Sequence, residues 1–349
     1  MILMSEHAPT SKAVRDRLQR PLRDLRISVT DRCNFRCVYC MPREIFGPGY
    51  AFLPRKDLLT LEEIARVAKV FSALGMRKVR ITGGEPLIRR NLEHLIEMIG
   101  ATEGVEDISL TTNGSMLTAD RAVSLRQAGL KRLTISLDAL DDATFKSIND
   151  VDYPASRVLD GINNARAAGF SDIKVNAVVR RGLNEHAVLD LAKHFRHSGC
   201  IVRFIEYMDV GETNGWNLDD VIPAADLVDR IDVLYPLEAV SPNYPGEVAK
   251  RWRYRDGAGE IGFITSVTQS FCGDCSRARL SAVGELYTCL FGTQGHDLRS
   301  LLRSGADDTQ LLQAVSEIWQ ARTDRYSELR ATATALPVTG QAKVEMSHI

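Results

Sequence analysis

The residues best placed for chemistry are three cysteines, Cys33, Cys37 and Cys40, spaced C-x3-C-x2-C on a predicted loop that leaves a short strand. Thiolates this close together can face one metal centre, and cysteine thiolate is the usual ligand of iron–sulfur clusters. Three thiolates on a four-iron cluster leave one iron without a protein ligand, so an exogenous molecule can bind there. A zinc site is the alternative, although structural zinc prefers four ligands and no nearby histidine supplies the fourth.

A second cysteine triplet, Cys272, Cys275 and Cys289, lies much later in the chain and again offers three thiolates. The alternative is a zinc site in which His296 is the fourth ligand. The seventh cysteine, Cys200, lies in an apolar strand pattern and is expected to be a buried thiol.

Two arginines, Arg277 and Arg279, follow the second triplet directly. On an extended strand both guanidinium groups point to one side, and a forked donor of this kind suits a phosphate, a carboxylate or a purine edge. A solvated, charged strand is the alternative. Together with Arg26, Arg80 and Lys174 on other predicted strands, the pair predicts a cationic pocket that fits a polyanionic substrate such as a nucleoside triphosphate.

The chain as a whole is almost neutral, since 44 basic and 45 acidic residues among 349 give a net charge of −1. This balance argues against a bulk electrostatic role on nucleic acid. The sequence shows neither a signal-peptide core nor an apolar run of membrane-spanning length, so no membrane partner is expected and a cytoplasmic location is predicted. Cysteines in a cytoplasmic chain point to metal or redox chemistry before disulfides.

Short strand patterns alternate with helical ones from residue 25 onward, which predicts six β-α repeats. The strands are predicted at 25–30, 78–82, 107–111, 132–138, 172–179 and 201–207. The helices are predicted near 60–74, 91–100, 118–128, 155–168 and 184–197, several of them ending near a glycine. Such repeats with right-handed crossovers give a parallel sheet, either open or curled into a partial barrel.

The strand sequences favour a barrel with a cavity, because apolar and polar side chains alternate along them. Ile27, Val79 and Ile135 lie on one face, whereas Arg26 and Arg80 lie on the other. Strands buried on both faces would read as nearly continuous apolar runs, and a packed barrel interior would be apolar. We therefore expect the apolar face to meet the helices and the polar face to line a ligand-filled cavity, in an α/β fold of the partial (β/α)6 barrel type.

Several motifs follow the predicted strands at their C-terminal ends, where barrel and open-sheet enzymes build their sites. They are the cysteine loop, Gly83-Gly84-Glu85-Pro86, Asn113-Gly114, Asp138 and Glu206-Tyr207-Met208. Singly each is weak, since a tight turn is the default explanation of the glycine pairs. Together on one rim they indicate an active site.

The pattern changes after the repeats. A long connection over 209–247 with one helix near 223–233 precedes short strands at 252–254, 261–264 and 278–282, and a closing helix is predicted over 307–330. We therefore predict a mobile N-terminal arm over 1–20 and a barrel over 21–210. A connection and a small C-terminal α+β extension carrying the second triplet follow over 211–330, with a tail over 331–349.

The first cysteine loop, with the aromatic Tyr39 just before its last cysteine, resembles the cluster loop of the radical S-adenosylmethionine (SAM) enzymes. From about residue 17 to residue 349 the chain resembles one family among them, the GTP 3′,8-cyclases, which are lyases of the first step of molybdenum cofactor biosynthesis. Residues 22–33, 80–87, 202–211 and 270–280 match that family closely, as does the layout of the two triplets.

The resemblance implies a role for each matching residue. The first triplet holds a [4Fe-4S] cluster that cleaves SAM, and the second holds another [4Fe-4S] cluster whose free iron meets the guanine of GTP. The matching SAM contacts are Tyr39, Gly84, Ser136 and Met208. The matching GTP contacts are Arg26, Arg80, Thr111, Lys174, Arg277 and Arg279. No catalytic residue is implied beyond the cluster ligands.

The implied reaction converts GTP to 3′,8-cyclo-7,8-dihydro-GTP. A 5′-deoxyadenosyl radical from SAM removes the ribose 3′ hydrogen, and the sugar radical attacks purine C8. The implied partners are an electron donor, a downstream pterin synthase and, as the family suggests, a second copy of the chain in a homodimer. Family members continue with two glycines beyond the segment like residues 346–349, so we expect this form to bind both ligands but to cyclise GTP poorly.

Two other functions remain open from the sequence. One is a different radical SAM enzyme with two clusters, such as a peptide maturase, although its auxiliary cysteines usually number more than three. The other is a zinc-stapled interaction protein without catalysis. An iron count distinguishes the last of these from the rest, because two clusters contain about eight irons per chain.

Overall fold

The computed structural model describes residues 13–211 and 214–332, with the side chains of residues 331 and 332 left out. The predicted tail over 331–349, and with it the question of a glycine terminus, therefore lies outside the residues whose side chains are described. Among the helices in the described ranges, none is both long enough and apolar enough to cross a membrane.

Six parallel strands form the centre of the fold, and they lie side by side in the order of the sequence. They are β1 (Asp24–Ser28), β2 (Lys78–Thr82), β3 (Asp107–Thr112), β4 (Arg132–Ser136), β5 (Ile173–Val179) and β6 (Ile201–Glu206). All six predicted strands are confirmed, with ends that shift by one or two residues. The predicted partial barrel of parallel strands is thus confirmed.

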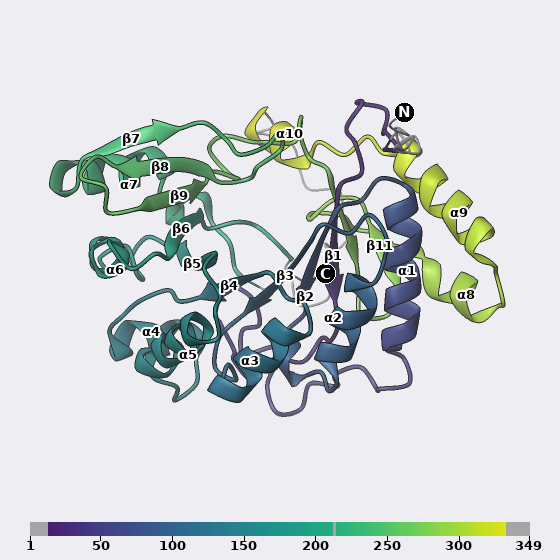
Figure 1. The fold of residues 1–349 in the computed structure, drawn as a ribbon. Coiled ribbons are helices and arrows are strands. Elements are labelled where there is room, and N and C mark those ends of the chain that lie inside the picture. The colour runs from purple at the N-terminus through teal and green to yellow at the C-terminus, as the bar shows by residue number, and fades with distance from the viewer. Residues whose placement is uncertain (1–12, 212–213, 333–349) are drawn as a thin grey trace, which may run out of the picture.

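Helices connect these strands and cover one face of the sheet (Figure 1). Five of them were predicted: α1 (Leu61–Ala73), α2 (Leu92–Gly100), α3 (Ala119–Gln127), α5 (Ala155–Ala167) and α6 (Ala187–Phe195). Helix α4 (Asp142–Asn149) was not predicted; its N-cap Asp141 accepts a hydrogen bond from the Thr144 backbone N–H at 2.8 Å. The short 3-10 turns η1 (Pro86–Ile88) and η2 (Leu218–Asp220) were not predicted either.

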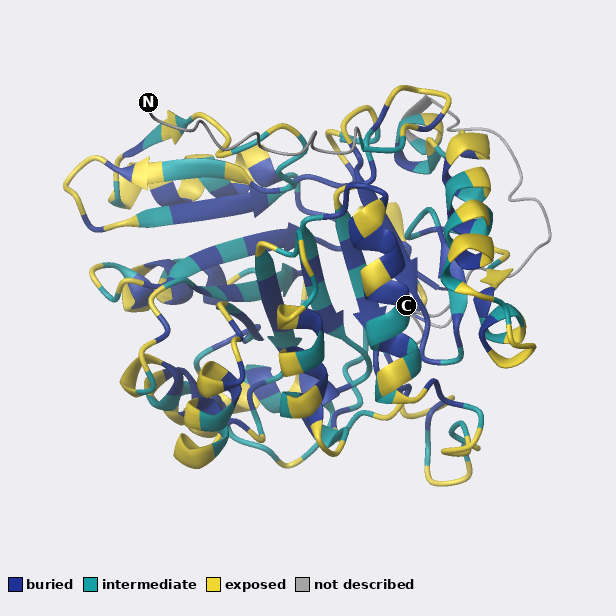
Figure 2. Ribbon diagram, turned by 45° about the vertical axis from the view of Figure 1, so that its right-hand side comes forward, coloured by how far each residue is buried: buried dark blue, intermediate teal, exposed yellow. Residues whose placement is uncertain are grey.

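The alternation along the strands gives the sheet two different faces, as predicted. Ile27, Val79 and Ile135 are at most 1% exposed and belong to the main hydrophobic core under the helices. Figure 2 shows the same division, with the inner sides of the helices buried and their outer sides exposed. The polar side chains of the strands are left to the opposite face, where they line a cavity.

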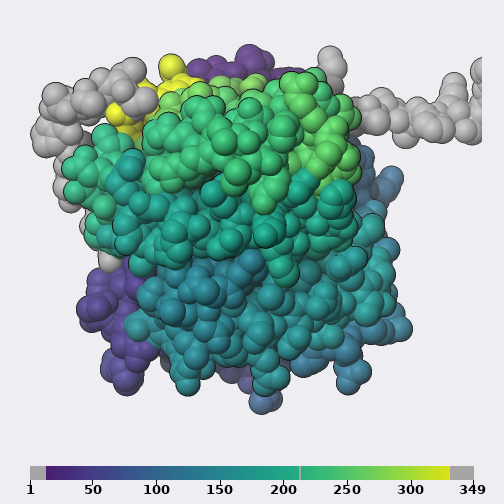
Figure 3. Space-filling model, turned by 90° about the vertical axis from the view of Figure 1, so that its left-hand side faces the viewer, coloured from purple at the N-terminus to yellow at the C-terminus, as the bar shows by residue number. Residues whose placement is uncertain are grey.

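The C-terminal extension continues the barrel sheet and does not form a sheet of its own. Strand β10 (Arg277–Leu280) pairs parallel with β1, and β9 (Glu260–Ile264) pairs parallel with β6. The remaining strands are β7 (Leu237–Val240), β8 (Lys250–Tyr254), β11 (Glu285–Tyr287) and β12 (His296–Asp297). The new pairings satisfy backbone groups that a six-stranded barrel would leave open at both edges. Figure 3 views the side carrying β7–β9, where this segment and the barrel form one continuous surface.

The helices of the extension are α7 (Ala224–Leu234), α8 (Leu298–Arg303), α9 (Asp308–Ala321) and α10 (Tyr326–Thr332). The helix predicted near 223–233 is confirmed as α7. The single closing helix predicted over 307–330 is wrong, because α9 ends where Arg322 adopts an extended conformation with φ −59° and ψ 131°. This break turns the Arg322 side chain inward.

The N-terminal segment from residue 13 onward packs against the body. The Val14 backbone N–H donates to Leu74 O at 2.9 Å, and Asp16 and Arg20 are each 2% exposed. Two charged side chains can be buried here because they pair with each other. A mobile arm was predicted over 1–20, but residues 13–20 of it are packed. Residues 1–12 lie outside the described ranges.

Candidate functional site

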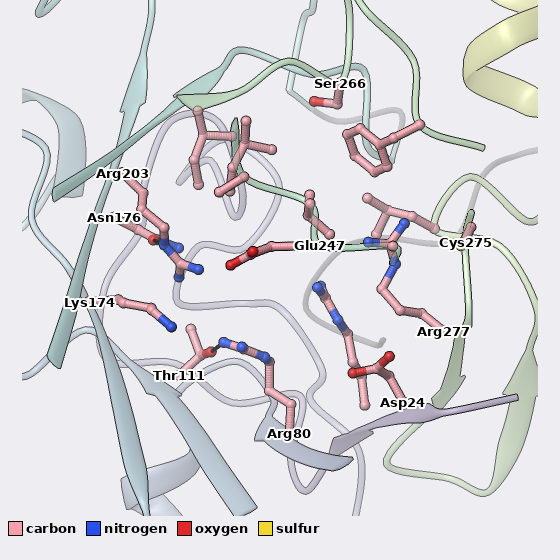
Figure 4. A pocket seen from close by; sticks show the side chains of 18 of the residues that line it. Asp24, Arg80, Thr111, Lys174, Asn176, Arg203, Glu247, Ser266, Cys275 and Arg277 are labelled. Atoms are coloured by element: carbon pink, nitrogen blue, oxygen red, sulfur yellow. Dashed lines mark hydrogen bonds between the residues drawn. The ribbon is translucent and has the colours of Figure 1, made fainter. Parts of the chain in front are cut away.

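A cavity of about 550 Å³ lies against the polar face of the sheet. This volume is within the usual range for small-molecule sites. Its wall reaches from Tyr39, in the first cysteine loop, to the second cysteine triplet. Figure 4 shows Lys174, Asn176 and Arg203 on one side and Arg277 with Cys275 on the other.

Strand register places three arginines side by side in this wall. Arg26 of β1 is in register with Arg279 of β10 on one side and with Arg80 of β2 on the other. Residues in register on neighbouring parallel strands share a face, so the three guanidinium groups form a row. Arg277 precedes Arg279 by two residues and lines the same cavity. All six predicted GTP contacts therefore come together here, since Thr111 and Lys174 also line the wall.

Uncharged groups hold several of these cations in place. Arg80 Nη1 donates to the hydroxyl oxygens of Thr111 and Thr134, each at 3.1 Å. Arg203 Nε donates to Asn176 Oδ1 at 2.9 Å. Such contacts orient a guanidinium group without neutralising its charge, so the positive charge stays available to an anion.

Burial and mutual repulsion destabilise the charged forms of the basic side chains in the wall. Burial lowers the pKa of Lys174 to about 8. Burial, with Arg80 and Arg132 nearby, lowers the pKa of Arg203 to about 9. Burial and the neighbouring Arg277 lower the pKa of Arg279 to about 10. A polyanionic ligand would relieve this repulsion, because an opposite charge stabilises the protonated form of each group.

Two arginines also have unused donors. In the described part of the chain, buried Arg277 Nε and Arg279 Nε and Nη1 have no hydrogen-bond partner. Buried polar groups are nearly always paired, so an exception in a cavity wall calls for a missing partner. These three donors belong to arginines that line the cavity, and they fit the oxygen or nitrogen acceptors of a bound nucleotide.

Cys33 of the first triplet has two hydrogen-bond donors at its sulfur. Cys33 Sγ accepts from the Phe35 backbone N–H at 3.4 Å and from Asn113 Nδ2 at 3.8 Å. Burial, with Glu85 nearby, raises the pKa of the Cys33 thiol to about 11. The protein alone thus disfavours a thiolate here, whereas coordination to a metal deprotonates a thiol outright. The donors then suit a metal-bound sulfur.

Tyr39 links the first triplet to the cavity. Its hydroxyl donates to Asp138 Oδ2 at 2.8 Å, and Asp138 Oδ1 accepts from the Val178 backbone N–H at 2.8 Å. Burial raises the pKa of Asp138 to about 6, although these two hydrogen bonds favour the carboxylate. Asp138, at the end of β4, therefore fixes the position of the Tyr39 ring.

The second triplet lies in a strongly cationic setting. Burial alone would raise the pKa of the Cys275 thiol, but the nearby guanidinium groups of Arg277, Arg322 and Arg279 outweigh it and lower that pKa to about 5. Arg322 Nη2 also donates to Cys275 Sγ at 3.2 Å. These cations therefore favour the thiolate form of Cys275, which is the form that binds metal.

Both triplets fit clusters better than single zinc ions. Over residues 13–211 and 214–332, no three His, Cys, Asp or Glu side chains converge on a position for one metal ion. A zinc ion requires its sulfur ligands about 2.3 Å from a single point. In a four-iron cluster each cysteine binds a different iron, so the sulfurs lie further apart.

The predicted SAM contacts divide into two groups. Tyr39, Ser136 and Met208 line the cavity, whereas Gly84 does not. A Cβ atom on Gly84 would lie 2.4 Å from the Arg32 carbonyl oxygen, so only glycine allows this turn to pack against the cysteine loop. Glu206, another rim residue, faces away and accepts backbone hydrogen bonds from Ala224 and Val267, each at 2.9 Å.

Several residues of the wall were not predicted from the sequence. Arg203 is one of them, and it is in register with Asn176 on the neighbouring strand. The loop over 241–249 gave no signal, yet the Tyr244 ring centroid lies 3.2 Å from Lys78 Nζ and both residues line the cavity. Figure 4 shows the Glu247 side chain extending from this loop into the cavity.

Comparisons with known proteins find relatives over nearly the whole chain. Residues 27–195 match the model of the Radical SAM superfamily, and residues 200–328 match that of Molybdenum Cofactor Synthesis C. The chain is 55% identical over 360 residues to a GTP 3′,8-cyclase of Acidothermus cellulolyticus, covering 97% of this chain and 99% of the relative. It is 46% identical over 339 residues to a GTP 3′,8-cyclase of Staphylococcus epidermidis, covering 97% of this chain and 99% of the relative.

A solved structure supports the fold. The chain aligns with the crystal structure of Streptococcus suis SuiB bound to S-adenosylmethionine at a TM-score of 0.61 and 15% identity. The alignment covers 89% of this chain and 70% of SuiB. At this identity the similarity concerns the arrangement of the strands and helices.

Proposed function

The chain belongs to the family of radical SAM GTP 3′,8-cyclases, and from this premise we propose that its cavity binds GTP and SAM together and converts GTP to 3′,8-cyclo-7,8-dihydro-GTP. This reaction is the first step of molybdenum cofactor biosynthesis. The observation that supports it most directly is the row formed by Arg279, Arg26 and Arg80, with unpaired buried donors on Arg279. The row lines a cavity whose wall reaches from Tyr39, in the first cysteine loop, to the second triplet, and a nucleotide bound there would contact the row.

The cations bind and orient the nucleotide. Arg26, Arg80, Lys174, Arg277 and Arg279 take up its phosphates and purine edge, since guanidinium groups donate pairs of parallel hydrogen bonds to such acceptors. We add Arg203 and Lys78 to this set because both line the same wall. Binding at several fixed donors holds the ribose in one place, which is the protein's main contribution to a radical reaction.

We assign SAM to the part of the cavity near the first cysteine loop. Tyr39, Ser136 and Met208 line the cavity, and Asp138 fixes Tyr39 through the hydrogen bond at 2.8 Å. Gly84 supports the site indirectly, by letting the turn after β2 pack against the cysteine loop.

Two [4Fe-4S] clusters complete the site, one held by Cys33, Cys37 and Cys40 and the other by Cys272, Cys275 and Cys289. When bound, the first cluster and SAM supply the 5′-deoxyadenosyl radical that removes the ribose 3′ hydrogen. The residues around the cavity keep water away from the reacting atoms. An electron donor, a pterin synthase that uses the product, a homodimer and a cytoplasmic location are further parts of this proposal.

The test is an anaerobic assay of the reconstituted protein with GTP, SAM and a reductant. We expect about eight irons per chain, formation of 5′-deoxyadenosine and formation of the cyclised nucleotide. Replacing the three cysteines of the first triplet with alanine should abolish SAM cleavage. Replacing those of the second should spare uncoupled SAM cleavage and abolish cyclisation.

The two triple variants control for each other, because each keeps one cluster. Equal loss of SAM cleavage in both, with the remaining cluster intact by iron count, contradicts this division of roles. A colourless protein that contains zinc and no iron contradicts the proposed function as a whole.

A further inference from the structure

A buried network of charged side chains lies behind the second cysteine triplet. Arg20 Nε donates to Asp16 Oδ2 at 2.6 Å, and Arg322 Nη1 lies 3.3 Å from the same oxygen. The three side chains are at most 1% exposed. Asp16 and Arg20 come from the N-terminal segment and Arg322 from the end of α9, so the network joins the two ends of the described chain.

The network contacts the cysteine loop at several atoms. Arg20 Nη1 donates to the Cys272 carbonyl oxygen at 2.9 Å, and Arg322 Nη1 donates to the Cys275 carbonyl oxygen at 2.7 Å. Arg322 Nη2 donates to the Cys275 sulfur itself at 3.2 Å. Arg322 therefore hydrogen-bonds to both the backbone and the sulfur of Cys275, a proposed cluster ligand.

The position of Arg322 is fixed from three further sides. Arg322 Nε lies 3.3 Å from a second carboxylate, at Asp324 Oδ2. Its guanidinium carbon lies 4.6 Å from the centroid of the Trp319 ring, and its backbone N–H donates to Trp319 O at 3.1 Å. The Trp319 indole N–H in turn donates to the Arg20 carbonyl oxygen at 3.1 Å. Arg322 thus has little freedom to leave the sulfur.

Stability alone does not account for this arrangement. Burying an ion pair usually costs as much as it contributes, and an uncharged donor could satisfy the same carbonyl oxygens. A positive charge against a sulfur has a specific effect on an iron–sulfur cluster, whose reduction potential depends on the local net charge and on hydrogen bonds to its sulfurs.

We propose that Arg322 is a positioning residue that holds Cys275 on the second cluster and raises the reduction potential of that cluster, while Asp16 limits the rise. The proposal rests on the proposed function in one respect, namely that the second triplet holds a cluster. The reduced cluster carries one more negative charge, so the guanidinium group stabilises it. The Asp16 carboxylate, 3.3 Å from the same guanidinium group, acts in the opposite direction.

The sign of two potential shifts separates this role from a merely structural one. Arg322→Gln removes the positive charge and should lower the midpoint potential of the second cluster. Asp16→Asn removes the negative charge and should raise it. If the network were only a brace for the cysteine loop, both substitutions would loosen the loop and move the potential in the same direction.

The experiment is a redox titration of the reconstituted full-length protein, followed by the electron paramagnetic resonance signals of both clusters. The first cluster is the internal reference and should keep its potential in every variant. Arg322→Lys keeps the charge and should lie between the wild type and Arg322→Gln. Arg196→Gln is a matched control, because Arg196 also pairs with an aspartate, Asp256, and lies 4.3 Å from the centroid of the Tyr235 ring.

Each outcome decides the proposal. An unchanged second potential in an Arg322→Gln protein with full iron content overturns it, as do shifts of Arg322→Gln and Asp16→Asn in the same direction. Loss of the second cluster in Arg322→Gln, but not in Arg322→Lys, supports the holding role. If both Arg322 variants fail to fold, Asp16→Asn decides, since only an upward shift agrees with the proposal. A wild-type protein with about four irons contradicts the second cluster itself, which is a separate failure.

Discussion

Lys174 offers the sharpest test of the proposed nucleotide site, because its charge should change within an accessible pH range. Its ammonium group lies in the cavity wall, and burial lowers its pKa to about 8. Asp172 Oδ1, 3.4 Å from Lys174 Nζ, partly offsets this effect. GTP should bind the charged form far better than the neutral one.

The size of the effect follows from this pKa. At about pH 7 most Lys174 side chains of the free protein are charged, whereas at about pH 9 only about one in ten is. If GTP requires the charged form, its dissociation constant should rise about tenfold between these values. Lys174→Met should weaken binding at about pH 7 by about 10- to 100-fold, since a hydrogen bond to a charged group contributes about 1.5–3 kcal/mol.

The stability of the folded protein should also depend on pH through Lys174. The pKa of Lys174 is lower in the folded protein than in the unfolded chain, where it is about 10.4. Between about pH 8 and 10.4 the folded state binds fewer protons, so the free energy of unfolding of the ligand-free protein should rise with pH over this window. Lys174→Met should lack this rise.

Isothermal titration calorimetry of the anaerobic protein with GTP, at several pH values, measures the affinities. The difference between wild type and Lys174→Met removes any titration of the nucleotide itself. Lys146→Met, which changes an exposed lysine paired with Asp152, is the control and should follow the wild type. Our reasoning is refuted if wild-type affinity is flat up to about pH 9, or if Lys174→Met keeps the wild-type pH profile.

Two further substitutions test the two ends of the cavity. Arg279→Gln should weaken GTP binding by about 10- to 100-fold, because two of its buried nitrogens have no partner among the described residues, and it should leave SAM affinity unchanged in the same calorimetric titrations. Tyr39→Phe removes the hydrogen bond to the Asp138 carboxylate at 2.8 Å and should weaken SAM binding by at most about 10- to 100-fold, since a hydrogen bond to a charged group contributes about 1.5–3 kcal/mol. Reversed effects, with SAM affected by Arg279→Gln or GTP by Tyr39→Phe, would contradict the assignment of the two ends.

The repeats were predictable from the sequence because their signals are local. Alternating side chains marked the six central strands, and buried apolar residues on one side marked their helices. Helix α4 was missed because it has only eight residues, although Asp141 before it is a favourable N-cap. The break in the predicted closing helix was missed because its cause is distant: Arg322 leaves the helical conformation and contacts Cys275 and Asp16.

The candidate site was predictable where one strand face carries it. Arg26, Arg80 and Lys174 were found because their polar character interrupts apolar strands at alternate positions. Arg203 lies between Val202 and Phe204 in the same way, but the apolar residues Ile201 and Ile205 share its face and hide the alternation. The contact between Tyr244 and Lys78 has no local signal at all, because a loop reaches it from across the cavity.

The strand order also shows how the barrel and the C-terminal extension both contribute residues to the cavity wall. The predicted boundary near residue 210 marks a change of pattern in the sequence, yet one sheet runs across it at both edges. Through its pairing with β1, strand β10 places Arg279 beside Arg26. A chain that ended at the boundary would expose the edges of β1 and β6 to unpaired contacts. It would also lack Arg279 of the cationic row and the whole second triplet, so the extension is required to complete the proposed substrate site and not only to enlarge the fold.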